Sequence, residues 1–327
     1  MINVRIIVML RSFFVSLSSS SWAQQTFSRW GIVKRLASRF IAGENSGDAI
    51  QAVRRLNERG IQATLDHLGE NTTTLDEANR AVDEVFHILA EIDRSGVRAN
   101  VSIKLSQIGL ILDQEVCSKN LKKILSKAGE LGNFIRIDME GSSLTEKTLA
   151  LFFEARESQF DNCGVVIQSY LYRSQADIQR ILSIHGKVRL CKGAYQEPPE
   201  IAYPRKRDVD ENYERLAEQL LDGAFSAGLP RLSGDDCIPP LPAYATHDEN
   251  LIKKICASAD SRGLPKNALE FQMLYGIRRD LQDQLAANGY PVRVYVPYGT
   301  HWFPYFMRRL GERPANVWFL MSNFFRR

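Results

Sequence analysis

The sequence lacks the glycine-rich motifs of two widespread nucleotide-binding folds. Neither G-x-G-x-x-G nor G-x-x-x-x-G-K-S/T occurs in its 327 residues. Those motifs bind phosphate groups through backbone N–H groups at a helix N-terminus. Their absence argues against a Rossmann domain and against a P-loop. A nucleotide cofactor would therefore have to be held by other loops.

Cysteine and histidine are sparse. The five cysteines are odd in number, lie far apart and form no C-x-x-C pair. This usage predicts reduced thiols in a cytosolic compartment, and neither a disulfide framework nor a zinc site. Of the five histidines, only His67 and His247 fall where strand ends are expected. A metal set of His67, Asp138, His247 and Asp248, as in barrel hydrolases, stays open as an alternative.

Long apolar runs and a strong charge of one sign are also missing. No stretch reaches the ~18 apolar residues that a membrane-spanning helix needs. The net charge is +4, and the basic residues are scattered, so no nucleic-acid partner is expected. The first thirty residues could pass for a signal peptide, but Arg11 splits their apolar run. We therefore expect an amphipathic N-terminal helix.

Short apolar runs recur along the chain, separated by segments of helix length. Repeated strand–helix units of this kind predict a (β/α)8 barrel with its site at the C-terminal ends of the strands. We expect a helical arm over residues 1–60, the barrel over 61–313 and a tail over 314–327. The eight runs are Ile61–Leu68, Asn100–Lys104, Phe134–Glu140, Val165–Gln168, Val188–Ala194, Ala243–Asp248, Ala268–Leu274 and Val292–Gly299.

Helix boundaries are marked by caps and glycines. Thr74 and Glu77 form a capping box at the start of a helix expected over Thr74–Ser95. The pattern in Trp30–Ile41 predicts a helix that stops near Gly43. Glycines just before each strand are expected to take the left-handed conformation that ends a helix. They are Gly60, Gly96, Gly132, Gly164, Gly186, Gly228, Gly263 and Gly289.

Polar side chains end the expected strands, and the barrel should gather them around one cavity. Lys104 and Asp138 each end an apolar strand, where an unpaired charge is too costly to keep. They could form a purely structural ion pair, or Lys104 could bind a substrate carboxylate. Gln168 could hydrogen-bond a flat heterocycle. The ends of the other strands bring Lys192, His247 and Tyr295 to the same cavity.

Two further segments carry candidate site residues. Arg189 and Lys192 are followed by Gly193 and Ala194, whose small size lets a planar ring or a phosphate approach the backbone. After the last strand, Tyr305, Arg308, Arg309 and Glu312 share one face of a helix. The two adjacent arginines could bind one carboxylate through paired N–H hydrogen bonds. Alternatively, they form a solvated basic face with an internal ion pair.

These motifs together resemble those of bacterial proline dehydrogenases, and the short N-terminal segment resembles that of the monofunctional members. The resemblance implies a distorted (β/α)8 barrel with an N-terminal helical arm, the last helix over the barrel top, and FAD as cofactor. The matching segments are Val101–Ser106, Ile135–Gly141, Gly164–Tyr170, Val188–Tyr195, Ala245–Asp248, Glu270–Gly276, Arg293–Gly299 and Pro304–Arg313.

Carried over by residue, the resemblance first implies a clamp for the substrate. Arg308, Arg309 and Lys104 would hold the proline carboxylate. Asp138 would keep Lys104 in place, and Glu312 would do the same for an arginine.

The resemblance also implies contacts to the proline ring and to the cofactor. Leu274 and Tyr305 would pack on the ring, and Tyr295 would crowd the edge where a 4-hydroxyl would lie. Arg189 would lie near flavin N5. Gln196 stands where fused members carry tryptophan, next to the ribose contacts. The other residues expected to contact FAD are Met139, Gln168, Lys192, Gly193, Ala194, Thr246 and His247.

The implied reaction is oxidation of L-proline to 1-pyrroline-5-carboxylate, the first step of proline catabolism to glutamate. Electrons would pass to a membrane quinone, so a cytoplasmic enzyme would contact the inner face of the cell membrane transiently. A separate pyrroline-carboxylate dehydrogenase would take the product. Two alternatives remain: a metal-dependent hydrolase or aldolase, and an amino-acid-binding module without a redox cofactor. A yellow colour would distinguish a flavoprotein from both.

Overall fold

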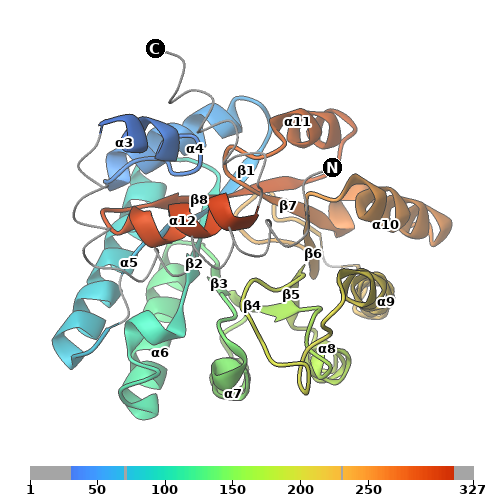
Figure 1. Ribbon diagram of the computed structural model, residues 1–327, viewed down its shortest axis with the longest axis horizontal. Helices are drawn as coiled ribbons and strands as arrows, with labels where there is room; N and C mark the ends of the chain where they lie inside the picture. Colours follow the sequence, from blue (N-terminus) through green and yellow to red (C-terminus); the bar gives the residue numbers. More distant parts are fainter. Residues whose placement is uncertain (1–30, 70–71, 230, 313–327) are drawn as a thin grey trace.

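The fold is a closed barrel of eight parallel strands, each paired with the next and β1 paired with β8 (Figure 1). The computed structural model describes residues 31–69, 72–229 and 231–312. The predicted (β/α)8 barrel is therefore confirmed. The strands are β1 Gln62–His67, β2 Ala99–Ile103, β3 Ile135–Ile137, β4 Cys163–Gln168, β5 Lys187–Cys191, β6 Pro242–Ala245, β7 Glu270–Leu274 and β8 Val292–Tyr298.

Helices surround the strands, and α12 crosses in front of them in Figure 1. Two 3-10 turns, η1 (Leu105–Ile108) and η2 (Lys266–Ala268), lie in connecting loops. Among the helices described, none is long and apolar enough to span a membrane. The helices are α3 Gly31–Ala37, α4 Ser46–Asn57, α5 Leu75–Ser95, α6 Gln114–Glu130, α7 Ser142–Glu157, α8 Ser174–Leu182, α9 Lys206–Ser226, α10 Glu249–Ser261, α11 Arg279–Ala287 and α12 Trp302–Glu312.

Most of the predicted caps and helix-ending glycines are present. The capping box at Thr74 is present, and Gly96 ends α5 in the left-handed conformation. Gly164 and Gly186 do not take positive φ; Gln159 (φ 66°) and His185 (φ 51°) do so in their place. Gly164 instead lies inside β4, where an added Cβ would come within 2.5 Å of Arg136 Nη1. That glycine is therefore needed for packing.

The N-terminal segment turns earlier than expected. The helix predicted over Trp30–Ile41 ends at Ala37, and Trp30 itself lies outside the described residues. The chain must leave the helix there because Ala42 N–H donates to Pro297 O at 2.9 Å. Next to it, Gly43 O accepts from Gly299 N–H at 3.0 Å. These bonds tie the segment to the C-terminal end of β8.

Helix α12 covers the C-terminal mouth of the barrel, as the resemblance implied. Its buried face joins residues of the N-terminal segment in an apolar cluster separate from the main core, against which Leu274 and Tyr295 pack. Both of these belong to strands, so the helix lies over the strand ends. The cluster contains Ala37, Phe40, Ile41, Leu68, Ile277, Trp302, Phe303, Tyr305, Phe306, Met307 and Leu310.

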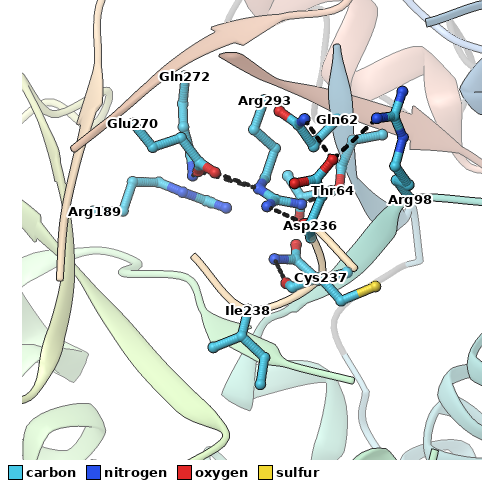
Figure 2. Close-up of polar contacts among 12 residues, drawn as sticks. Gln62, Thr64, Arg98, Arg189, Asp236, Cys237, Ile238, Glu270, Gln272 and Arg293 are labelled. Atoms are coloured by element: carbon cyan, nitrogen blue, oxygen red, sulfur yellow. Dashed lines mark hydrogen bonds and ion pairs between the residues drawn. The ribbon is translucent and has the colours of Figure 1, made fainter. Parts of the chain in front are cut away.

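The opposite end of the barrel is closed by a polar network (Figure 2). Arg293 and Glu270 are fully buried and form an ion pair at 3.0 Å. Arg293 Nη2 also donates to Asp236 O at 2.7 Å, and Arg98 Nη1 lies 3.0 Å from Asp236 Oδ2. The loop between α9 and β6 is thus anchored inside the N-terminal end. A buried charge pair of this kind is held by its hydrogen bonds. We therefore assign this network a structural role and look for the functional site at the C-terminal end of the barrel.

Candidate active site

A connected network of charged and polar side chains fills the barrel below α12. Lys104 Nζ lies 2.8 Å from each carboxylate oxygen of Asp66. Tyr295 Oη lies 2.6 Å from Asp66 Oδ2 and 2.9 Å from Asp138 Oδ2, and its single proton can serve one of them at a time. Arg189 Nη1 donates to Asp138 Oδ1 at 2.8 Å. Three strands, β1, β5 and β8, and the segments that follow β2 and β3 therefore meet at one site.

Electrostatics keep Lys104 charged. Burial alone would lower the pKa of Lys104, but the charges of Asp66 and Asp138 outweigh it and the pKa is raised. The pKa of Tyr295 is raised by burial and by the same two carboxylates. The site therefore offers a permanent cation and a neutral phenol, which suits an anionic group on the substrate.

The main partner of Lys104 differs from the expected one. Asp138 Oδ2 lies 3.8 Å from Lys104 Nζ, so Asp138 is only a secondary partner. The closer partner is Asp66, which is 1% exposed. Asp66 faces the barrel interior from β1. The parallel pairing of β1 with β2 places it beside the end of β2. The alternation of Asp66 with His67 along the strand places one of them inside the barrel, but the stagger between β1 and β2 decides that Asp66 reaches Lys104.

Arg189 lies at the centre of the network. Besides Asp138, its Nη2 donates to Ser102 Oγ at 3.0 Å, and its guanidinium stacks over the Tyr295 ring at 5.5 Å. It is 5% exposed, and its Nε has no hydrogen-bond partner among the described residues. The bonds to the Asp138 carboxylate and the Ser102 hydroxyl fix the guanidinium plane, which leaves Nε available to a bound group.

The other expected cofactor contacts line the ends of β4 and β5. Gln168 is 3% exposed, and its Oε1 has no partner in the described part of the chain. Gly193 has a φ of 108°, and a Cβ there would come within 2.3 Å of the Tyr170 ring. Only glycine fits this close approach. Lys192 Nζ is paired with Asp210 at 2.6 Å and with Asp248 at 3.2 Å.

The remaining cofactor candidates differ in exposure. Met139 is buried in the main core, and Ala194 is exposed. Thr246 is buried, and its Oγ1 accepts from Asp248 N–H at 3.1 Å. His247 Nε2 accepts from Leu274 N–H at 3.0 Å, which leaves Nδ1 to carry the proton of the neutral ring.

Helix α12 contributes the arginines. Tyr305 is buried, and Arg309 stacks over its ring at 5.2 Å. Arg308 is exposed. Burial raises the pKa of the Tyr195 hydroxyl, and the positive charge of Arg308 acts on the same hydroxyl. The side chain of Glu312 lies outside the described residues, so its pairing with an arginine stays a prediction.

The metal alternative finds no support in the geometry. His67 faces outward on β1, because Asp66 beside it faces the barrel interior. His247 is bonded to the backbone of β7, and Asp138 is bonded to Arg189 and Tyr295. Within the ranges that the structure describes, no three His, Cys, Asp or Glu side chains gather as metal ligands.

The fold and the site define a (β/α)8-barrel enzyme with a buried Lys–Asp–Tyr–Arg network at its C-terminal end. The chain belongs to the proline dehydrogenase family, whose sequence profile matches residues 49–322. It is therefore an oxidoreductase of proline catabolism that acts on proline in the first step. The predicted family, fold and enzyme class are confirmed.

Similar proteins agree with this assignment. Proline dehydrogenase 1 of Bacillus subtilis subsp. natto is 38% identical over 315 residues, 96% of this chain and 98% of the relative. Proline dehydrogenase of Deinococcus radiodurans is 41% identical over 291 residues, 88% of this chain and 89% of the relative. A crystal structure of proline utilization A (PutA) from Bdellovibrio bacteriovorus inactivated by N-propargylglycine has a TM-score of 0.80 and 25% identity. That match covers 97% of this chain and 38% of the PutA chain.

Proposed function

We propose that this enzyme uses FAD to oxidise L-proline to 1-pyrroline-5-carboxylate at the network below α12. The observation that carries the proposal is the Asp66–Lys104 pair, which holds a partly buried cation where the helix with Arg308 and Arg309 covers the barrel. A small zwitterion with a carboxylate matches this arrangement of charge.

In this account the clamp binds the substrate carboxylate. Lys104, Arg308 and Arg309 donate to it, and the guanidinium fork fixes its plane. Glu312 holds one of the arginines. Leu274 and Tyr305, which pack in the apolar cluster around α12, contact the ring carbons. This grip orients the carbon next to nitrogen, which is what a positioned reaction requires.

A flavin fits the residues at the ends of β4 and β5. The two buried unpartnered atoms, Gln168 Oε1 and Arg189 Nε, are an acceptor and a donor that suit the polar edge of a flat heterocycle. A bound flavin would accept a hydride at N5 from the substrate carbon next to nitrogen. The charge of Arg189 would stabilise the negative charge that develops there. Met139, Lys192, Gly193, Ala194, Thr246 and His247 would hold the rest of FAD.

The substrate amine must lose a proton before its carbon can give up a hydride. The cations of Lys104 and Arg189 lie close to the site, and nearby positive charge lowers the pKa of a bound ammonium group. The chain's own charges would therefore favour the free amine when proline is bound.

Tyr295 would select the substrate. Its phenol packs against the apolar cluster around α12 and is held by Asp66 and Asp138, so it cannot move aside for a larger ring. A 4-hydroxyl pressed against it would lose its water at a cost of about 1–3 kcal/mol. Proline is therefore preferred over trans-4-hydroxyproline.

The electrons and the product have to leave the enzyme. We assign the electrons to a membrane quinone, reached by transient contact of a cytoplasmic protein with the inner face of the cell membrane. The product would pass to a separate pyrroline-carboxylate dehydrogenase. The fused arrangement in the Bifunctional protein PutA of Escherichia coli is consistent with such a partner; this chain is 27% identical to it and covers 24% of its length.

Two measurements on the purified protein test this proposal. The cofactor released by denaturation should run as FAD on chromatography. Turnover of L-proline with a dye acceptor should yield a product that o-aminobenzaldehyde traps as its coloured adduct. An amino-acid-binding module would bind proline without colour or product, and that result would overturn the proposal.

A further inference from the structure

Arg189 reaches across the interior of the barrel from β5, and residues of other strands hold its charged end. Its Nη2 donates to Ser102 Oγ of β2 at 3.0 Å, and its Nη1 donates to Asp138 Oδ1 at 2.8 Å. In the closed order of the barrel, β2 lies three strands away from β5. The residues at this far end therefore decide where the positive charge of Arg189 lies.

A pair of buried hydroxyl groups forms part of this anchor. Ser102 Oγ lies 3.1 Å from Thr64 Oγ1 of β1, and the two residues are 2% and 0% exposed. Arginine can only donate, so Ser102 Oγ accepts from Arg189 and keeps its own proton for Thr64. Donation to Thr64 polarises the Ser102 oxygen and makes it a better acceptor. Figure 2 shows Thr64 and Arg189 pointing into the same part of the barrel interior.

The hydroxyl pair lies one layer below the Asp66–Lys104 pair. Thr64 precedes Asp66 by two residues, and Ser102 precedes Lys104 by two, so side-chain alternation directs both hydroxyls to the barrel interior. Branched apolar residues usually fill such layers in a (β/α)8 barrel. Two neighbouring hydroxyls in their place indicate that this layer serves a polar group, and Arg189 is the charged group that Ser102 contacts.

Three contacts fix the guanidinium. Asp138 and Ser102 hold its two terminal nitrogens, and its central carbon lies 5.5 Å from the centroid of the Tyr295 ring. Thr64 is paired with Tyr295 in the register of β1 and β8, so the hydroxyl pair lies beside that ring. A guanidinium with one anchor can turn about that bond, whereas two anchors fix its plane. Ser102 therefore sets the direction of the Arg189 Nε, which has no partner in the described part of the chain.

We propose that Ser102, supported by Thr64, is a positioning residue that directs Arg189 toward the flavin. The inference rests on the proposed function, because it needs a flavin close to the Arg189 charge. That charge stabilises the negative charge that develops on the flavin, and it does so only from the right direction. The substrate clamp does not use this bond. A misdirected Arg189 should therefore slow hydride transfer and destabilise the reduced flavin, while the affinity for proline is kept.

Ser102→Ala tests the inference with little change in volume. The limiting rate at which proline reduces the flavin without air should fall about tenfold, and the proline concentration that gives half this rate should stay within about twofold. The reduction potential of the bound flavin should become more negative, by ~30 mV if the balance of oxidised and reduced flavin shifts tenfold. A serine that only made room for Arg189 would leave both quantities unchanged, because alanine makes the same room.

Thr64 supplies a matched pair of variants. Thr64→Val removes the hydroxyl and keeps the shape, and it should lower the rate and the potential in the same direction, the rate by about threefold. Thr64→Ser keeps the hydroxyl and should behave like the wild type. Thr148→Val is the control, since Thr148 is an equally buried threonine on α7 outside this network, and it should change neither quantity. This pair also decides the question if Ser102→Ala does not fold.

Wild-type rates and potentials in folded Ser102→Ala and Thr64→Val would overturn the inference. A higher requirement for proline with an unchanged limiting rate would overturn it too, because Ser102 would then belong to substrate binding. If proline fails to reduce the wild-type flavin, the proposed function fails instead. A crystal structure of Ser102→Ala still tests the positioning in that case. The guanidinium of Arg189 should turn about its bond to Asp138, and an unmoved guanidinium would contradict the inference.

Discussion

Asp66 binds Lys104 with both oxygens of its carboxylate at 2.8 Å, from the neighbouring strand and 38 residues away in sequence. Asp66→Asn should therefore leave a partly buried lysine whose next carboxylate, that of Asp138, is 3.8 Å away. We expect a loss of about 3 kcal/mol in the free energy of unfolding, because one charge of a buried pair is left. The KM for proline should rise with it. Denaturant unfolding and steady-state kinetics measure both; unchanged values would show that Asp138 alone suffices.

The carboxylate clamp predicts a strong effect at Arg309. Arg309→Lys keeps the positive charge but loses the paired N–H groups and the stacking over Tyr305. The KM for proline should rise more than about tenfold, since a charged hydrogen bond contributes ~1.5–3 kcal/mol. Steady-state kinetics measure the effect, and the flavin spectrum serves as the folding control. A wild-type KM with that spectrum intact would rule out the clamp.

Asp138 joins two parts of the site. Asp138→Ala should cost stability and activity together, because Arg189 loses its 2.8 Å partner and Tyr295 loses one of its two carboxylates. The scale is about 3 kcal/mol for an uncompensated buried charge. Thermal unfolding and turnover should both fall. A melting temperature and a turnover like those of the wild type would mean that Asp138 is not part of the working network.

Tyr295 is expected to set the preference between proline and trans-4-hydroxyproline. Tyr295→Ser removes the ring that crowds the substrate edge and leaves Asp66 and Asp138 without the phenol. The ratio of kcat/KM values for the two substrates should shrink, chiefly through lost proline turnover. The ratio is measured for wild type and variant side by side. Equal ratios would show that Tyr295 only packs the rim.

Lys187 gives the fold a pH dependence that is separate from catalysis. Burial, with the nearby charges of Arg136 and Arg156, lowers the pKa of Lys187 to about 8. Below that pH the folded protein carries a poorly solvated charge, so Lys187→Met should be more stable by about 1–2 kcal/mol near neutral pH. As the pH rises from 8 toward 10.5, the folded wild type releases this proton while the unfolded chain keeps it. The advantage of the variant should therefore shrink, as denaturant unfolding across this range would measure. A constant difference would contradict the prediction.

The strands and most of the site followed from the sequence because both depend on local patterns. Each apolar run became a strand. As predicted, Gln168 ends β4 and Lys104 lies just beyond β2, whereas Tyr295 lies in the middle of β8 and not at its end. Strand ends shifted by a few residues where hydrogen bonding stops early, as at β3, which covers only Ile135–Ile137. The barrel topology then brought these side chains together.

Long-range partners could not be predicted in this way. The start of α7 at Ser142 has no local side-chain cap, so no capping signal in the sequence marks it. Its first N–H donates to Glu197 Oε1 at 2.8 Å, from a loop 55 residues away. The Asp66–Lys104 pair was missed for the same reason, since the stagger between β1 and β2 decides which carboxylate reaches the lysine. Such contacts depend on three-dimensional register, which a local pattern does not carry.

The measurement that tests the account most directly is the visible spectrum of the purified protein before and after proline is added without air. The account predicts flavin absorbance bands that bleach when L-proline is added and return when a quinone is supplied. It also predicts that Arg309→Lys needs far more proline for the same bleaching. A colourless protein, or a flavin spectrum that L-proline leaves unchanged, would contradict the assignment of this barrel to flavin-dependent proline oxidation.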